Sequence, residues 1–172
     1  MTLGLDVIEN DTTIGSMNDD QMFFNFFGMS PQQFRDAMVT IDTTPANADT
    51  EVHLATSEII WIDGNTALDT VTMGCNAAIV GAGTCALADR EPSILVIDGD
   101  LALTGTPHFY GLVFITGNVN GGGNTTFHGA LITSGTVNVT SGSLDVWFNT
   151  DVINSLRTIG PLGNPSGSWK DF

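Results

Sequence analysis

The residue types that could carry chemistry in this chain are two cysteines, three histidines and several aspartates that flank glycines. Cys75 and Cys85 stand ten residues apart in a segment rich in glycine and alanine. A structural zinc site needs four ligands and no histidine lies near this pair in the sequence, so the spacing does not favour zinc. The pair predicts a disulfide, which would indicate an oxidising compartment. The alternative is two small buried thiols in a cytosolic protein.

Asparagine and aspartate side chains follow glycines at equivalent places in a sequence repeat. Asn65, Asp100 and Asn118 would align in a polar column if successive repeats stack on one another. Oxygen ligands in a row suit calcium, but asparagine, aspartate and glycine are also the residues that a tight turn requires. We predict turn chemistry and no cofactor, and we keep calcium as the alternative.

Asp63 and Asp98 are the carboxylate pair that a polysaccharide hydrolase would need. We place them two repeats apart, at ~10 Å, which is slightly beyond the separation that inverting enzymes use. His53, His108 and His128 do not share a phase in the repeat, so they are not expected to form a metal or general-base site. No nucleophile elbow, P-loop or zinc-protease motif appears, and we predict that the protein is not an enzyme.

The elements that position these groups are predicted from a sequence repeat. A glycine follows a run of β-forming residues about every 18 residues. A fixed period near 20 residues is typical of stacked architectures in which each repeat buries its apolar edge on its neighbours. We therefore predict a mainly β fold, a single-stranded β-solenoid (β-helix) with ~18-residue coils, in which Phe109 and Phe127 stack. The predicted corner glycines are Gly64, Gly81, Gly99, Gly117 and Gly135.

The predicted strands, such as IIWID, ILVID and LVFIT, are apolar on both faces. A strand with one wet face would alternate, so one set of side chains should fill the solenoid and the other should be covered from outside. Trp61, Phe114 and Ile132 are in phase on the second set. They form either an exposed row that could bind carbohydrate or a surface buried beneath helices, and we favour burial. The period is interrupted between about Cys75 and Pro92, around the cysteine pair.

Helical signals flank the repeat. Residues 15–40 predict a short helical hairpin on one flank, because Asn18 can cap the first helix and Ser30-Pro31-Gln32-Gln33 forms a capping box before the second. Residues 42–57 read as a connector, and residues 149–158 predict a helix that caps the end of the solenoid, with Trp169 and Phe172 pinning the tail. We assign 1–57 to a helical and connector region and 58–172 to the capped solenoid, together one structural domain.

The charge balance excludes several partners. The chain has 172 residues with 19 acidic and 4 basic side chains, a net charge of −15. Nucleic acid is therefore not expected as a partner, because phosphate binding needs cationic side chains, and anionic lipid surfaces are disfavoured for the same reason. Such a charge suits a protein that is exposed outside a cell or that comes from a halophilic source.

The start of the chain, MTLGLDVIEN, has no basic region and no long apolar core, so we expect no signal peptide here. No apolar run reaches the roughly 18–20 residues of a spanning helix. We hypothesise that a membrane segment precedes Met1 in the full-length gene product.

The run ILVIDGDLALTGTPHFYGLVFITGNVNGGGNTTFHGALITSGTVNV, followed by VWFNTDVINSLR and the final SWKDF, resembles the extracellular part of PilX-like pilus assembly proteins. These are minor pilins of type IV pili, and the resemblance covers roughly residues 58–172. It implies an N-terminal membrane helix that is missing here, a location on the pilus or cell surface, and partners among other pilins, pilus assembly proteins or a host or abiotic surface. It implies no catalytic residues.

The expected function is therefore a non-enzymatic structural or adhesion module of a type IV pilus-like system. The first alternative is a carbohydrate-binding or carbohydrate-cleaving β-helix protein. The second is a bactofilin-like polymer-forming solenoid, which would have open ends and reduced cysteines.

Overall fold

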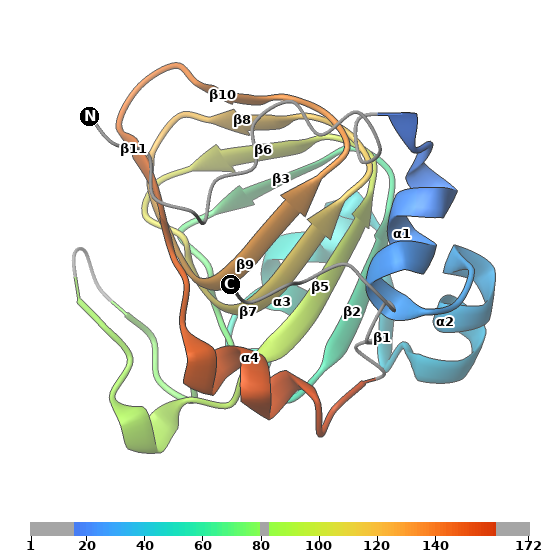
Figure 1. Cartoon of the computed structure of the whole chain (residues 1–172). Helices are drawn as coiled ribbons and strands as arrows, with labels where there is room; N and C mark the ends of the chain where they lie inside the picture. The colour runs from blue at the N-terminus through green and yellow to red at the C-terminus, as the bar shows by residue number, and fades with distance from the viewer. Residues whose placement is uncertain (1–15, 80–82, 161–172) are drawn as a thin grey trace, which may run out of the picture.

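The computed structural model describes residues 16–79 and 83–160, and two parallel sheets face each other in it (Figure 1). The larger sheet follows the order β1 (Ile41–Thr43), β2 (Ile59–Asp63), β5 (Ser93–Asp98), β7 (His108–Ile115), β9 (Asn124–Thr133) and β11 (Ser143–Trp147). A short strand, β4 (Thr72–Met73), pairs with β7 off this path. The smaller sheet follows the order β10 (Val137–Val139), β8 (Val119–Gly121), β6 (Leu101–Thr104) and β3 (Thr66–Asp69).

The described part of the chain holds four α-helices: α1 (Asp19–Phe27), α2 (Pro31–Met38), α3 (Ala48–Val52) and α4 (Thr150–Leu156). Short 3-10 helices occur at Pro45–Asn47 and Leu87–Asp89. The capping signals place the first two helices as expected, because Asn18 and Ser30 each form a complete capping box and Gly28 ends α1 in the left-handed conformation. α3 lies in the segment that was predicted to be a connector.

The predicted fold class, a mainly β single-stranded β-solenoid, is wrong. The described chain is an α/β-type fold of two parallel sheets with four α-helices. α1 and α2 cover one face of the larger sheet, and α4 lies across the starts of its strands (Figure 1). The glycine period misled the prediction because it records only the offset between neighbouring parallel strands, and a parallel ladder of another fold class can have the same offset.

The 18-residue period is the offset between partner residues in several ladders. Ser93 pairs with Gly111 and Gly111 with Gly129 in the larger sheet, and Leu101 pairs with Val119 in the smaller one. Between β2 and β5 the offset is 35 residues, because the segment that contains the cysteines leaves the sheets as a loop. The loop increases the difference in residue number, but β2 and β5 still pair as neighbouring parallel strands.

The inner core lies between the two sheets and joins them into one body. Leucine and valine side chains of the smaller sheet meet the inward-facing isoleucines and valines of the larger one, and Ala48 and Val52 of α3 are fully buried with them. Phe109 and Phe127 stack here as predicted, with ring centroids 4.7 Å apart and nearly parallel planes.

A second core lies between the larger sheet and the helices. Phe23 and Phe27 of α1 and Phe34 of α2 pack against Trp61 and Phe114, which alternate in the strands with the residues of the inner core. Both faces of the larger sheet are thus buried at β2, β5 and β7, which explains their continuous apolar runs.

Paired glycines let two long strands bend where the chain turns. Gly111 of β7 and Gly129 of β9 are register partners with φ of +152° and +140°, a region that favours glycine. A β-carbon on Gly129 would overlap the carbonyl oxygen of Gly111. No helix among the described residues is long and apolar enough to cross a membrane.

Candidate interaction surface

The largest group of exposed apolar side chains lies where both sheets end, at β10 and β11. We call this surface the open edge and define it by the side chains of Val137, Val139, Asp145, Val146, Trp147 and Phe148. Its five apolar members are between 42% and 75% exposed, and Phe148 is the most exposed of them. β10 and β11 each have a strand partner on one side only in the described chain.

The open edge exposes the last residues of the stacks that form the inner core. Val146 is the register partner of Phe127, which stacks on Phe109, so a column of buried side chains reaches its end at Val146. Val137 likewise pairs with the buried Val119 in the smaller sheet. These valines occupy core positions, but nothing in the described chain continues the column beyond them.

The predicted helical cap at this end is wrong, because α4 does not cover β10 and β11. This helix packs against β7 and β9, where Val152 joins Tyr110 and Leu156 joins the core beneath α1. It turns back across the flank of the larger sheet rather than over β10 and β11 (Figure 1). Trp169 and Phe172, predicted to pin the tail, lie outside the described residues.

The opposite edges of the sheets, at β1 and β3, are covered by α3. The Asp49 carboxylate of α3 accepts a hydrogen bond from the backbone N–H of Asp69 in β3, at 2.9 Å. His53, directly after α3, accepts one from the backbone N–H of Thr72 through Nδ1, at 3.2 Å. The two ends of the fold therefore differ. α3 covers the end at β1 and β3 and accepts a backbone hydrogen bond from β3, whereas the end at β10 and β11 exposes apolar side chains.

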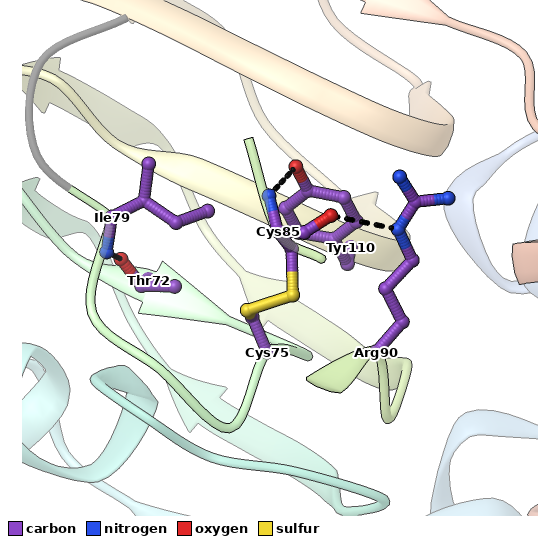
Figure 2. The surroundings of a disulfide bond; sticks show 6 residues. All are labelled: Thr72, Cys75, Ile79, Cys85, Arg90 and Tyr110. Carbon is purple, nitrogen blue, oxygen red and sulfur yellow. Dashed lines mark hydrogen bonds between the residues drawn. A yellow bond between two sulfur atoms is a disulfide. The ribbon is translucent and has the colours of Figure 1, made fainter. Parts of the chain in front are cut away.

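The disulfide predicted from the cysteine spacing is confirmed, because Cys75 is bonded to Cys85 (Figure 2). The loop is tied to the larger sheet through Tyr110, whose phenol oxygen accepts a hydrogen bond from the backbone N–H of Cys85 at 2.8 Å. Arg90 donates through Nε to the carbonyl oxygen of Cys85 and lies 5.5 Å from the centre of the Tyr110 ring. At the other side of the loop, the N–H of Ile79 donates to the Thr72 hydroxyl.

Tyr110 also stacks on His128, its register partner in β9, with ring centroids 4.3 Å apart. Burial lowers the pKa of His128 from its usual value, and the positive charge of Arg90 and the nearby His108 lower it further. His108 and His128 thus come close enough to interact although their phase in the repeat differs, while His53 is at α3. The neutral form of His128 fits this crowded, partly cationic place.

A shallow hollow of about 250 Å³ lies where α1 and the start of α2 meet the ends of β2 and β5, lined by Asp20, Arg35, Trp61 and Asp98 among others. Two of its charged groups, Arg35 and Asp98, have hydrogen-bond partners. Arg35 donates two hydrogen bonds of 2.8 Å to Asp42 and one of 3.2 Å to Asp63, and its guanidinium lies over the Trp61 ring. These bonds lower the pKa of Asp42 from its usual value.

The predicted distance between Asp63 and Asp98 is wrong. The two residues are direct register partners on neighbouring strands, one strand spacing of roughly 4.8 Å apart rather than two. The error arose because the cysteine loop was counted as a repeat. Asp63 accepts from Arg35, and Asp98 accepts from the Thr116 hydroxyl at 3.0 Å, so both carboxylates act in the structure as hydrogen-bond acceptors.

The polar column predicted after the glycines exists, and its oxygens accept hydrogen bonds from the next turn along. Asn65 accepts from the backbone N–H of Asp100, Asp100 from that of Asn118, and Asn118 from that of Thr136. These hydrogen bonds join successive turns to one another. In the part of the chain that the structure describes, no group of three or more histidine, cysteine, aspartate or glutamate side chains is placed to hold a metal ion.

Three of the predicted corner glycines lie against an earlier glycine of the set. A β-carbon on Gly99 would meet Gly64, one on Gly117 would meet Gly99, and one on Gly135 would meet Gly117. Gly81 lies outside the described residues. The Trp61 and Phe114 side chains, considered as an exposed row for carbohydrate, are buried beneath α1, and Ile132 is half-buried beside them.

The open edge was missed by the sequence prediction, although a signal was present. Residues 137–139 and 143–147 alternate apolar and polar side chains, unlike the continuous apolar runs within β2, β5 and β7. No protein-family model, curated protein or solved structure matches the chain.

Proposed function

We propose that the protein is a non-enzymatic structural module of a type IV pilus-like system, acting outside the cell in pilus assembly or surface attachment. The open edge is the observation that carries this proposal. Exposed apolar patches bordered by unpaired strand edges are typical of protein interaction sites, because natural proteins otherwise cover such edges. Binding another protein there would bury Trp147 and Phe148, which belong to the residue types that dominate interfaces.

Two further observations support this setting. The disulfide between Cys75 and Cys85 fits an oxidising compartment such as the periplasm or the cell exterior. The sequence from about residue 58 onward, including the segment that forms the open edge, resembles the extracellular part of PilX-like minor pilins. Both are compatible with a domain carried outside the membrane by a segment that precedes Met1.

The test is made in the source cell. We replace both Trp147 and Phe148 by serine in the full-length gene and count surface pili and attached cells. We expect both or one of these to fall, while the amount of the protein at the surface stays unchanged, because the two side chains are 62% and 75% exposed and contribute little to folding.

The matched control is Leu54→Ser, which removes a side chain of 44% exposure just after α3, at the opposite edge of the sheets. It should leave pili and attachment unchanged. Normal pili and normal attachment in the Trp147/Phe148 variant would exclude the proposal. The full-length gene product should also begin with a short basic leader and ~20 apolar residues, and a different start would argue against the pilin setting.

A further inference from the structure

The open edge has two chemical halves that a partner must match. Leu144 and Val146 of β11 face the inner core, since their register partners Thr125 and Phe127 are buried. Asp145 and Trp147 alternate with them and face outward. A strand that extends the sheet beyond β11 would therefore need apolar residues on one face and partners for a carboxylate and an indole on the other.

Asp145 lacks a basic partner within the chain's own sequence neighbourhood. From Gly99 to Leu156 the sequence contains no lysine or arginine, and Asp145 accepts a hydrogen bond only from the nearby Ser143 hydroxyl among the bonds described for it. An exposed charge in the middle of an edge strand opposes pairing with another strand unless that strand brings the opposite charge.

A second copy of this chain is a poor occupant of the open edge. A two-fold contact between two β11 strands, centred on the strand, would place Asp145 opposite Asp145, and it would bring together two molecules of net charge −15. A head-to-tail contact would need the β1 and β3 edges, which α3 covers. Both ways of self-association thus meet a physical obstacle.

We infer that the open edge binds an extended segment of a different protein that adds a strand beside β11, with apolar side chains toward the core and a lysine or arginine opposite Asp145. This inference rests on the proposed function and names the class of partner for the same surface. Backbone hydrogen bonds along β11 would supply affinity, and the charge at Asp145 would select the partner and exclude further copies of this acidic chain.

The experiment uses the full chain, labelled with ¹⁵N, and two synthetic peptides, VTVKVTV and VTVEVTV. They differ only in the central charged residue. Because each sequence reads the same in both directions, this residue lies on the same face as Asp145 whether the peptide pairs parallel or antiparallel to β11. We expect the lysine peptide to shift the amide signals of β11 and to bind about fivefold more tightly than the glutamate peptide. In Asp145→Lys the preference should reverse, while Asp36→Lys, the same charge change on the exposed face of α2, should keep it.

Each outcome decides the inference. Equal affinities for the two peptides, no binding of either, or shifts confined to other strands would overturn it. A concentration-dependent dimer that Trp147→Ser abolishes would mean that a second copy is the occupant. Binding of the lysine peptide only after removal of residues 1–15 or 161–172 would mean that the chain covers its own edge.

These results are distinguishable from failure of the proposed function. If the Trp147/Phe148 variant loses pili or attachment but neither peptide prefers the expected charge, the module still acts through this surface and only the class of partner is wrong. If the peptides behave as expected but pili and attachment are normal, the edge binds a basic strand in another setting.

Discussion

The phenol oxygen of Tyr110, on the central strand β7 of the larger sheet, accepts a hydrogen bond from the backbone N–H of Cys85 at 2.8 Å. This bond fastens the disulfide loop to the sheet from inside, since Tyr110 is fully buried and Cys85 is nearly so. The loop, the aromatic ring and the neighbouring histidine are therefore parts of one packed unit rather than separate features.

Replacing Tyr110 by phenylalanine should destabilise the protein by about 1–3 kcal/mol, because the buried N–H of Cys85 loses its acceptor. Removing the disulfide in Cys75→Ala/Cys85→Ala should cost about 2–4 kcal/mol. The triple variant should lose less than the sum, because a loop without its disulfide can move so that water reaches the N–H. Urea unfolding of the four proteins measures this coupling, and additive losses would show that loop and ring are independent.

Stability should fall as the pH is lowered through the range in which His128 titrates. The folded state lowers the pKa of His128 below its usual value of 6.5, so the unfolded chain binds the proton more tightly. The stability from the neutral ring is complete above about pH 6.5 and is lost as the pH falls toward the lowered pKa of the folded state.

The measurement compares thermal unfolding of the wild type and His128→Phe between pH 7.5 and 5.0. Phenylalanine keeps a ring against Tyr110 but does not titrate, so its melting temperature should fall less on acidification. Parallel pH curves for the two proteins would mean that His128 has the same pKa in the folded and unfolded chain.

Arg35 joins α2 to the larger sheet through Asp42 and Asp63. Arg35→Met, which keeps an apolar stem over Trp61, should cost at most about 1 kcal/mol at pH 7, because the pairs are partly exposed and screened by water. The lowered pKa of Asp42 means that its share of this stability is present above the usual value of 3.8 and is lost below it. The difference from the wild type in urea unfolding should therefore shrink from pH 7 to pH 3, and Arg157→Met serves as a control at an exposed arginine.

Gly129→Ala should destabilise the protein by about 1–3 kcal/mol, because an alanine is strained at a φ of +140° and its β-carbon would overlap the carbonyl oxygen of Gly111. Gly121→Ala is the matched control in the smaller sheet, where a β-carbon would meet nothing nearer than 3.6 Å. Similar melting temperatures for both variants would indicate that β9 can shift to accept the methyl group.

Local sequence signals predicted the positions of α1 and α2 correctly, whereas the glycine period predicted the wrong fold class. The capping boxes at Asn18 and Ser30 located α1 and α2, because a cap depends on neighbouring residues alone. Glycine spacing gave the strand offsets but not the fold class, since the same offset occurs in any parallel ladder in which successive strands are joined by connections of equal length.

The candidate site could be predicted only in part. The cysteine spacing indicated the disulfide, but its contact with Tyr110 depends on how a loop folds back over the sheet. The separation of Asp63 and Asp98 was mistaken because the length of the loop between β4 and β5 does not reveal whether it adds a strand beside them. The open edge depends on where α4 packs, and the apolar stripe of Val152, Ile153 and Leu156 fits the flank of a sheet as well as its end.

α3 covers the edge at β1 and β3, and no helix among the described residues covers β10 and β11. If the open edge binds a strand as we propose, the molecule therefore has one joining edge and not two. A subunit with a single joining edge can finish an assembly or start it, but it cannot serve as a repeating link within a chain of identical subunits. Complexes formed through this edge should therefore have a one-to-one stoichiometry and a defined polarity, with each copy marking an end.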